Sequence, residues 1–120
     1  GLAEDAGGFF TLAKGAMHDK QFAEADAYFA KALALEPGAS RIANGRAVNY
    51  YHNKQIAEAV ALAEEVVAAA PDFGPAWINL ALFHAEAGNA QRASECYAKA
   101  QDLGLEPAKK VDKALEESAG

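Results

Sequence analysis

The sequence repeats itself with a period of 34 residues, which constrains the possible folds more than any other feature. Pro37 and Pro71 are one period apart, and small or apolar residues recur at the same spacing in three successive copies. The columns kept most closely are Ala13/Ala47/Ala81, Ala25/Ala59/Ala93 and Ala32/Val66/Ala100. Seven further columns keep an apolar or aromatic residue in at least two of the three copies. A fixed period of this length indicates stacked structural repeats.

Each period is predicted to contain two amphipathic helices. In the first copy, apolar residues occur at 9, 12, 13 and 16, and then at 22, 25, 29, 32 and 33. This spacing places them on one face of each helix. Polar stretches at 18–21, 52–55 and 86–89 separate the helices, and of these only the third contains a residue suited to a left-handed cap, Gly88. Pro37 and Pro71 end the second helices, because proline cannot continue the hydrogen-bond ladder.

These columns resemble the tetratricopeptide (TPR) repeat, whose signature is W-x2-L-G-x2-Y, then A-x3-F, then P. The third copy reads Trp77-x2-Leu80-Ala81-x2-His84 and Ala93-x3-Tyr97. The first copy reads Phe9-x2-Leu12-Ala13-x2-Ala16, then Ala25-x3-Phe29 and Pro37. The resemblance implies an all-α fold, a right-handed α-solenoid of three helix-turn-helix (TPR) repeats with a C-terminal capping helix.

The period also predicts where the units begin and end. We expect a disordered tail, or residues left from cloning, at 1–5, repeats at 6–39, 40–73 and 74–107, and a capping helix and tail at 108–120. Two extra residues in the third copy place Pro107 after 103–106. The helix over 107–118 has Ala108, Val111, Ala114 and Leu115 on one side, so it is suited to cover the last apolar face of the stack. Lys109 and Lys110 stand in its first turn, where the helix dipole disfavours them.

Composition and charge narrow the classes of partner. The 120 residues fit one domain, and the formal net charge of −6 repels phosphate backbones and anionic membrane surfaces. Nucleic acid and membrane insertion are therefore not expected, and no apolar run approaches the ~18 residues of a membrane span. The chain starts at Gly1 and not at Met, so we take it as a trimmed or processed product. Its one cysteine cannot form an intrachain disulfide and excludes no redox environment, so the compartment is open.

Catalytic and metal-binding motifs are missing from the sequence. It has no glycine-rich phosphate loop, nucleophile elbow, H-E-x-x-H or C-x-x-C. His18, His52 and Glu86 share one repeat position, but stacked helices ~8–10 Å apart cannot bring them to one zinc ion. His84 is expected to be packed and hydrogen-bonded, and Cys96, with no neighbouring base, to be inert. We predict a protein that is not an enzyme and that takes no cofactor and no metal.

In the TPR family the first helices line a concave groove that commonly holds peptides. Carried over by position, the groove residues are Phe10, Thr11, Lys14, Met17, His18, Arg41, Asn44, Val48, Tyr51, His52, Ile78, Asn79 and Leu82, with Glu86 beside them. Their apolar members fall outside the core columns, so we expect an exposed patch of the kind that marks binding sites. Lys14 and Arg41 lie among them, which favours a protein or peptide partner with apolar anchors and acidic residues.

Two alternatives concern how the groove is used. One subset of the family holds a terminal carboxylate with a Lys/Asn/Asn/Lys/Arg set, and the matching positions here carry Phe10, Lys14, Gly45, Pro75 and Asn79, so that clamp is absent. The other alternative is an assembly or oligomerisation element, or a fragment of a longer TPR protein. In that case the chain stacks through an uncapped N-terminal face near Phe9 and Leu12.

The second copy departs most from the pattern. It has Ala43, Arg46 and Ala63 where its neighbours have larger apolar residues. Arg46 is interpreted in two ways. Either its stem packs along the interior while its guanidinium reaches a carboxylate or a helix-end carbonyl, or it lines the groove.

Overall fold

The structure is a computed structural model that describes residues 4–119. In that part of the chain there are seven α-helices and no strand. They are α1 (Ala6–His18), α2 (Phe22–Leu35), α3 (Ser40–His52), α4 (Ile56–Ala69), α5 (Gly74–Glu86), α6 (Ala90–Asp102) and α7 (Lys109–Ala119). None of the described helices combines the length and apolar character needed to cross a bilayer.

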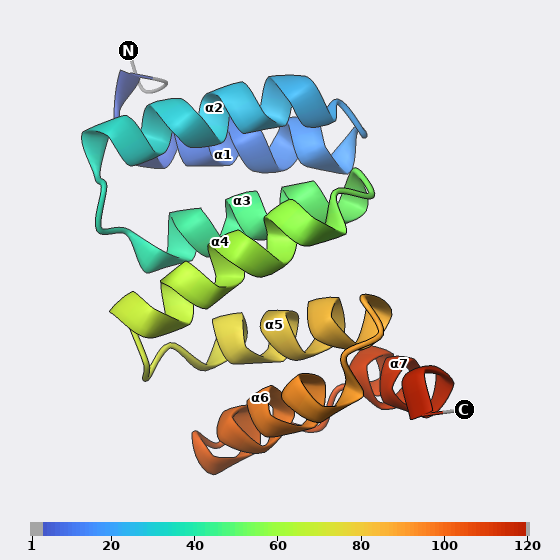
Figure 1. The fold of residues 1–120 in the computed structure, drawn as a ribbon. Coiled ribbons are helices and arrows are strands. Elements are labelled where there is room, and N and C mark those ends of the chain that lie inside the picture. Colours follow the sequence, from blue (N-terminus) through green and yellow to red (C-terminus); the bar gives the residue numbers. More distant parts are fainter. Residues whose placement is uncertain (1–3, 120) are drawn as a thin grey trace.

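The helices form consecutive hairpins stacked along one axis. Each odd-numbered helix from α1 to α5 packs against the helix that follows it, and each hairpin packs on the next (Figure 1). The stack measures 49 × 27 × 21 Å along its principal axes. It is an open, elongated solenoid, with α1, α3 and α5 in one layer and α2, α4 and α6 in the other.

The three helix-to-helix turns share one backbone conformation. Lys20, Lys54 and Gly88 stand at equivalent positions and have φ of 63°, 66° and 89°. One residue further on, the backbone N–H donates to a carbonyl of the preceding helix at 2.8 Å in every turn. This closure satisfies carbonyls that a helix end leaves unpaired. The turn thus has the same geometry whether glycine or lysine occupies the left-handed position.

Side-chain caps and prolines set several helix ends. The Asp5 carboxylate accepts a hydrogen bond from the Gly8 N–H at 2.6 Å, and Asn89 caps α6 through the Arg92 N–H at 3.3 Å. Pro75 occupies the first turn of α5, where no N–H is needed. Asp5 falls within the expected tail of 1–5 but caps α1, while residues 1–3 of that tail lie outside the described residues.

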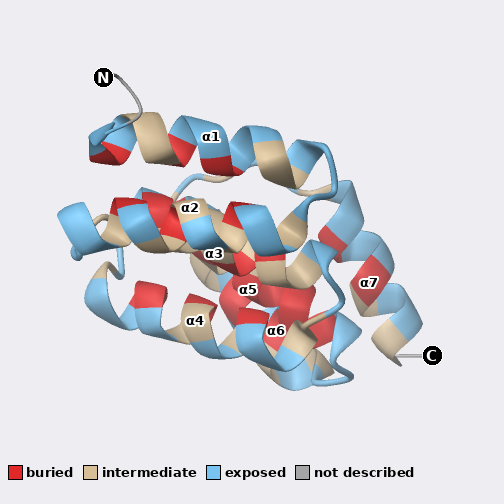
Figure 2. Cartoon of the chain, turned by 90° about the horizontal axis from the view of Figure 1, so that it is seen from above, coloured by how far each residue is buried: buried red, intermediate tan, exposed pale blue. Residues whose placement is uncertain are grey.

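The two alanine columns that the repeat keeps unchanged are buried inside the hairpins. All six members of these columns are fully buried, namely Ala13, Ala25, Ala47, Ala59, Ala81 and Ala93. Figure 2 shows the buried positions gathered on the helix faces that look into the stack. Around them the core divides into two clusters, one formed by the first hairpin with Ile42, the other by the later hairpins with α7.

The helix α7 covers the end of the stack and packs chiefly against α5, less against α6. Val111 and Ala114 are buried there. The Tyr97 hydroxyl accepts from the Ala108 N–H and donates to Asp112 Oδ1, both at 2.9 Å, so it joins α6 to the start of α7. The cap begins two residues later than the expected helix at 107–118.

Arg46 takes the first of the two roles proposed for it. Its Nε donates to Asp26 Oδ1 at 2.7 Å and its Nη2 to Asp26 Oδ2 at 3.2 Å. The pair links α3 to α2, and the hydrogen bond with Asp26 raises the pKa of Arg46. The residue therefore bridges two repeats.

Candidate functional site

An apolar cavity of about 230 Å³ lies between α3, α5 and the start of α7. Its lining from α3 and α5 consists of Val48, Tyr51, His52, Ile78, Asn79, Leu82 and Phe83. The segment Ala108–Val111 closes one side, so the exposed Lys109 and Lys110 lie beside an otherwise apolar surface. We call this space the apolar cavity.

A second, larger cavity lies beside the turns between α1 and α2 and between α3 and α4. Its volume is about 610 Å³, and it is lined by Lys14, Met17, His18, Lys20, Phe22, His52 and Lys54. Three of the chain's 11 Lys and Arg residues thus face one space in a protein of net charge −6. We call it the basic cavity. Because His52 lines both, the apolar and basic cavities adjoin.

Nine of the thirteen groove residues predicted from the sequence line these two cavities. The other four lie elsewhere. Thr11 lines a hollow of about 300 Å³ between α1 and α2. Asn44 accepts a hydrogen bond from Asn79 Nδ2 at 3.1 Å, which links α3 and α5. Lys14 Nζ and Arg41 Cζ lie 4.5 and 4.6 Å from the ring centroid of Phe10. Both cations therefore stack on the same aromatic side chain.

The expectation that the apolar groove residues are exposed is wrong for two of them. Phe10 is 6% and Leu82 7% exposed. The Phe10 ring packs 6.1 Å from that of Phe29, beside Gly45. Leu82 belongs to the same buried cluster as Val111 and Ala114 of α7. Met17, Val48, Tyr51 and Ile78 are half-buried, so the groove offers hollows lined by partly covered apolar groups.

Tyr51 is held rigidly at the edge of the apolar cavity. Its ring stacks on Phe83 at 5.0 Å, and its hydroxyl donates to Glu86 Oε1 at 2.9 Å. Burial, reinforced by Glu86, raises the pKa of Tyr51 to about 12, so the hydroxyl stays protonated at neutral pH. A fixed aromatic ring binds at little entropic cost, since few torsions remain to be ordered.

His52 stands where the two cavities meet. Burial lowers the pKa of His52, and the charges of Lys110 and Lys54 lower it further. The neutral form of the His52 imidazole is therefore favoured, and the neighbouring lysines carry the positive charge beside it. It also packs edge-on to Tyr51, with ring centroids 5.3 Å apart.

Sequence reasoning missed the lining residues contributed by α7 and by the turns, above all Lys20, Lys54, Lys109 and Lys110. The capping helix was expected only to cover the stack. The available signal was the pair of lysines in its first turn, a placement that the helix dipole disfavours.

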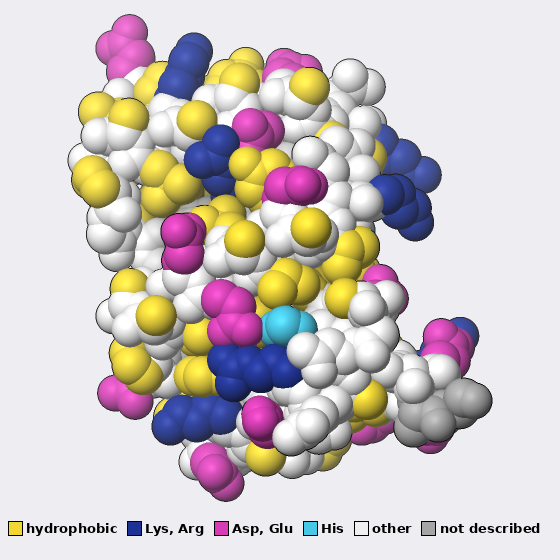
Figure 3. Space-filling model, viewed as in Figure 1, with side chains coloured by type: hydrophobic (Ala, Val, Ile, Leu, Met, Phe, Trp, Pro, Cys, Tyr) yellow, Lys and Arg dark blue, Asp and Glu magenta, His cyan; other side chains and the backbone are white. Residues whose placement is uncertain are grey.

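The reactive-looking residues outside the groove have structural roles. His84 Nε2 lies 2.8 Å from Glu64 Oε2, and Glu64 also pairs with Arg92 at 2.7 Å. Figure 3 shows the face seen in Figure 1, on which acidic, basic and apolar side chains are mixed. Cys96 is fully buried, and burial raises its pKa to about 11, so the thiolate is scarce at neutral pH. Within residues 4–119, no three His, Cys, Asp or Glu side chains converge to hold a metal ion.

An open stack of helical hairpins with cavities beside its first helices has the architecture of a repeat protein. The sequence profile described as "Tetratricopeptide repeat" matches residues 16–72 and again residues 50–104. The chain belongs to the tetratricopeptide repeat family, and it is a non-catalytic protein-interaction module. No curated protein is matched significantly by the sequence.

Solved TPR domains share the fold at low sequence identity. The Sgt2 TPR domain from Aspergillus fumigatus is 23% identical, with a TM-score of 0.85 over 95% of this chain and 76% of that one. The first TPR of Spaghetti (RPAP3), bound to the HSP90 peptide SRMEEVD, is 15% identical, with a TM-score of 0.84 over 99% and 93%. The TPR2B domain of yeast Sti1, in a complex with pHsp70, is 18% identical, with a TM-score of 0.83 over 95% of each chain.

Proposed function

We propose that the chain binds an extended segment of a partner protein in the groove of α1, α3 and α5, with α7 completing one end. The observation that carries this proposal is the adjoining pair of cavities, one apolar and one basic, that share His52. An apolar side chain of the partner enters the first, and acidic groups lie against the second. The partner is thus a peptide segment with an apolar anchor followed or preceded by Asp or Glu.

The charge distribution supports an acidic partner. The whole chain is acidic, yet Lys14, Lys20 and Lys54 line one cavity, and no ion pair is formed by them within residues 4–119. Such unpaired positive charge attracts an acidic segment and repels a basic one. This attraction is expected to weaken as salt rises, because the lysines are exposed.

Two of the structural relatives hold chaperone-derived chains, which supports a peptide as the kind of ligand. The residues at the clamp positions argue for a different specificity here. Phe10 is buried, and a side chain at position 45 has no room, because a Cβ there would lie 2.9 Å from Phe29 Cε1. Positions 10 and 45 therefore offer no polar group to a terminal carboxylate.

Charge reversal in the basic cavity tests the proposal. The probe is an array of short peptides in which an Asp/Glu block and one Leu or Phe anchor vary independently. Peptides with both features should bind wild type, and Lys14→Glu with Lys54→Glu should weaken the best of them about tenfold, or ~1.4 kcal/mol. Lys31→Glu with Lys99→Glu, on α2 and α6, changes the net charge equally and should leave binding intact. Preference for basic peptides, or equal losses in both double variants, contradicts the proposal.

The assembly alternative is supported by one exposed residue. Leu12 is 39% exposed, whereas Leu80, its counterpart in the third repeat, is fully buried. An apolar side chain in this position favours stacking of another copy or repeat on α1. Light scattering over a concentration series separates the two functions. Oligomers that Leu12→Glu dissociates, together with no binding of acidic peptides, would establish assembly as the function.

A further inference from the structure

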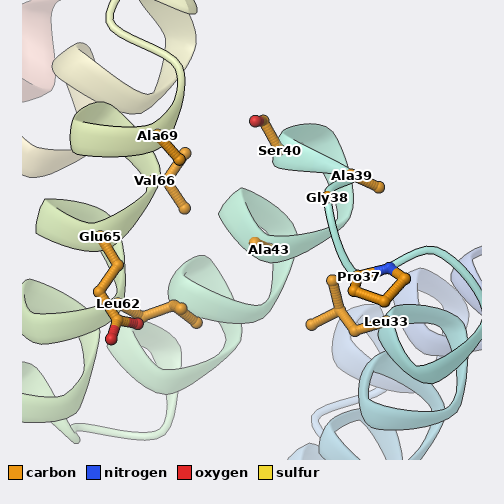
Figure 4. Close-up of a pocket in the computed structure, with 10 residues that line it drawn as sticks. All are labelled: Leu33, Pro37, Gly38, Ala39, Ser40, Ala43, Leu62, Glu65, Val66 and Ala69. Atoms are coloured by element: carbon orange, nitrogen blue, oxygen red, sulfur yellow. The ribbon is translucent and has the colours of Figure 1, made fainter.

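A second apolar hollow lies between the first and second repeats, outside the groove. Its volume is about 320 Å³, and it opens to solvent between the α2–α3 connection and α4. Figure 4 shows Ala43 of α3 between Leu33 and Pro37 on one side and Leu62, Val66 and Ala69 of α4 on the other. We call it the notch. It shares no residue with the apolar or the basic cavity, and it lies where the two core clusters meet.

In the first repeat an aromatic ring fills the equivalent place. Ala43 is the counterpart of Phe9, whose ring stacks on Tyr28 at 6.4 Å and lies 5.5 Å from the Lys31 ammonium. One period later, Tyr28 and Lys31 become Leu62 and Glu65, and both of these line the notch. The notch is therefore the ring site of the second repeat, left vacant by an alanine.

In the third repeat the equivalent site is filled by a ring that also donates a hydrogen bond. There Trp77 occupies the position, and its Nε1–H donates to the Pro71 carbonyl at 2.7 Å. The counterpart of Pro71 is Pro37, which lines the notch and whose carbonyl accepts no hydrogen bond from residues 4–119. An indole placed in the notch thus finds an apolar wall and an acceptor at the position that satisfies Trp77.

The charge beside the notch differs from that of its neighbours. Lys31 and Lys99 occupy this position in the other repeats, and Glu65 occupies it here. A carboxylate is repelled by the negative face of an aromatic ring, so it does not replace the lysine as a stacking partner. It is suited instead to pair with a basic group carried next to the ring.

We propose that the notch is a second docking site, which receives a tryptophan side chain from a partner protein with a Lys or Arg adjacent to it. The inserted indole completes the packing of the middle repeat as Trp77 does in the third. The space is ample, because an apolar cavity of ~150 Å³ accommodates benzene in an engineered protein. This site is independent of the groove, so partners at the two sites bind at the same time.

Free indole is the first probe, and two-dimensional NMR of the backbone amides monitors its binding. Shifts should concentrate at Ala43, Val66 and Ala69, with a Kd on the order of 1 mM for so small a ligand. Ala43→Trp and Ala43→Phe place a ring in the notch from within, so each should raise the Tm and weaken indole binding at least about tenfold. Ala61→Trp, at an exposed site of α4, is the matched control and should leave indole binding unchanged.

Blocked dipeptides test the charge. N-acetyl-Trp-Lys-amide should bind about two- to fivefold more tightly than N-acetyl-Trp-Glu-amide, and Glu65→Gln should remove the difference. The groove variant Lys14→Glu with Lys54→Glu should bind indole as wild type does, which separates this site from the proposed peptide groove. Indole shifts that avoid the notch, or that persist in Ala43→Phe and Ala43→Trp, overturn the proposal.

Discussion

Small residues set the distance between the helices of each hairpin. Ala13, Ala25, Ala47 and Ala59 are fully buried between paired helices, so each occupies a space that has no room for a larger side chain. Each alanine removes little apolar area from water, and the hairpin gains by the close approach that this small side chain permits. The stability of the stack therefore depends on volume at these positions more than on hydrophobicity.

A larger side chain at one of these positions should push the two helices of a hairpin apart. Ala25→Leu or Ala59→Leu is expected to lower the free energy of unfolding by about 1–3 kcal/mol through overpacking. Thermal denaturation monitored by circular dichroism measures this loss of stability. Ala23→Leu, on the exposed side of α2, adds the same side chain and should change the Tm little. Equal melting temperatures for wild type and Ala25→Leu would contradict the packing described.

At the scale of elements, one carboxylate joins three helices. Glu64 of α4 lies 2.8 Å from His84 Nε2 of α5 and 2.7 Å from Arg92 Nη2 of α6. The hydrogen bond from Arg92, assisted by that of His84, lowers the pKa of Glu64. The ionised form is thus favoured in the folded state, and the second repeat is tied to the third.

This shift predicts a loss of stability in acid. Because the pKa of Glu64 is lower in the folded chain than its unfolded value of 4.5, the ionised carboxylate stabilises the fold fully at pH values above 4.5. This stabilisation is lost as the pH falls through the pKa of Glu64 in the folded chain. Wild type should exceed Glu64→Gln in stability at pH 7, by about 0.5–1 kcal/mol because the pair is partly exposed. Denaturant titrations from pH 7 down to about pH 3 should show the two converging. A stability difference between wild type and Glu64→Gln that does not change with pH would show that the ionisation of Glu64 is not its cause.

The attachment of α7 depends on one hydroxyl group. Tyr97→Phe removes the acceptor for the Ala108 N–H and the donor to Asp112, which should cost about 1–2 kcal/mol. Because these contacts hold the start of α7, Tyr97→Phe should speed hydrogen exchange at the amides of α7 more than at those of α1–α6. Tyr28→Phe is the control, since the structure gives the Tyr28 hydroxyl no hydrogen bond to residues 4–119. Uniform exchange changes over all seven helices would show that Tyr97 acts on the fold as a whole.

Repeat spacing predicted the elements closely and their surfaces less well. The 34-residue columns placed the six paired helices, since helical periodicity and prolines act locally. They did not reveal that Lys20 and Lys54 adopt positive φ, because the turn geometry is imposed by the flanking helices. The burial of Leu82 was missed for a related reason. It depends on where α7 docks, and no local pattern encodes that docking.

At the scale of the whole molecule, stacking brings together cavities that no single repeat contains. The apolar cavity needs α3, α5 and α7, and the basic cavity needs two turns that are one period apart in sequence. The notch likewise lies between two core clusters contributed by different hairpins. Binding surfaces of this kind are a property of the array, so a variant that disturbs the stacking should impair several of them at once.

The proposed function depends on a partner segment binding in the groove of α1, α3 and α5. The most direct measurement is amide chemical-shift mapping of the chain titrated with the tightest acidic, apolar-anchored peptide of the array. If the segment binds there, we expect shifts around Lys14, Val48, Tyr51, His52 and Ile78, together with the first turn of α7. Shifts confined to α2, α4 and α6, or to the hollow beside Leu12, would contradict it.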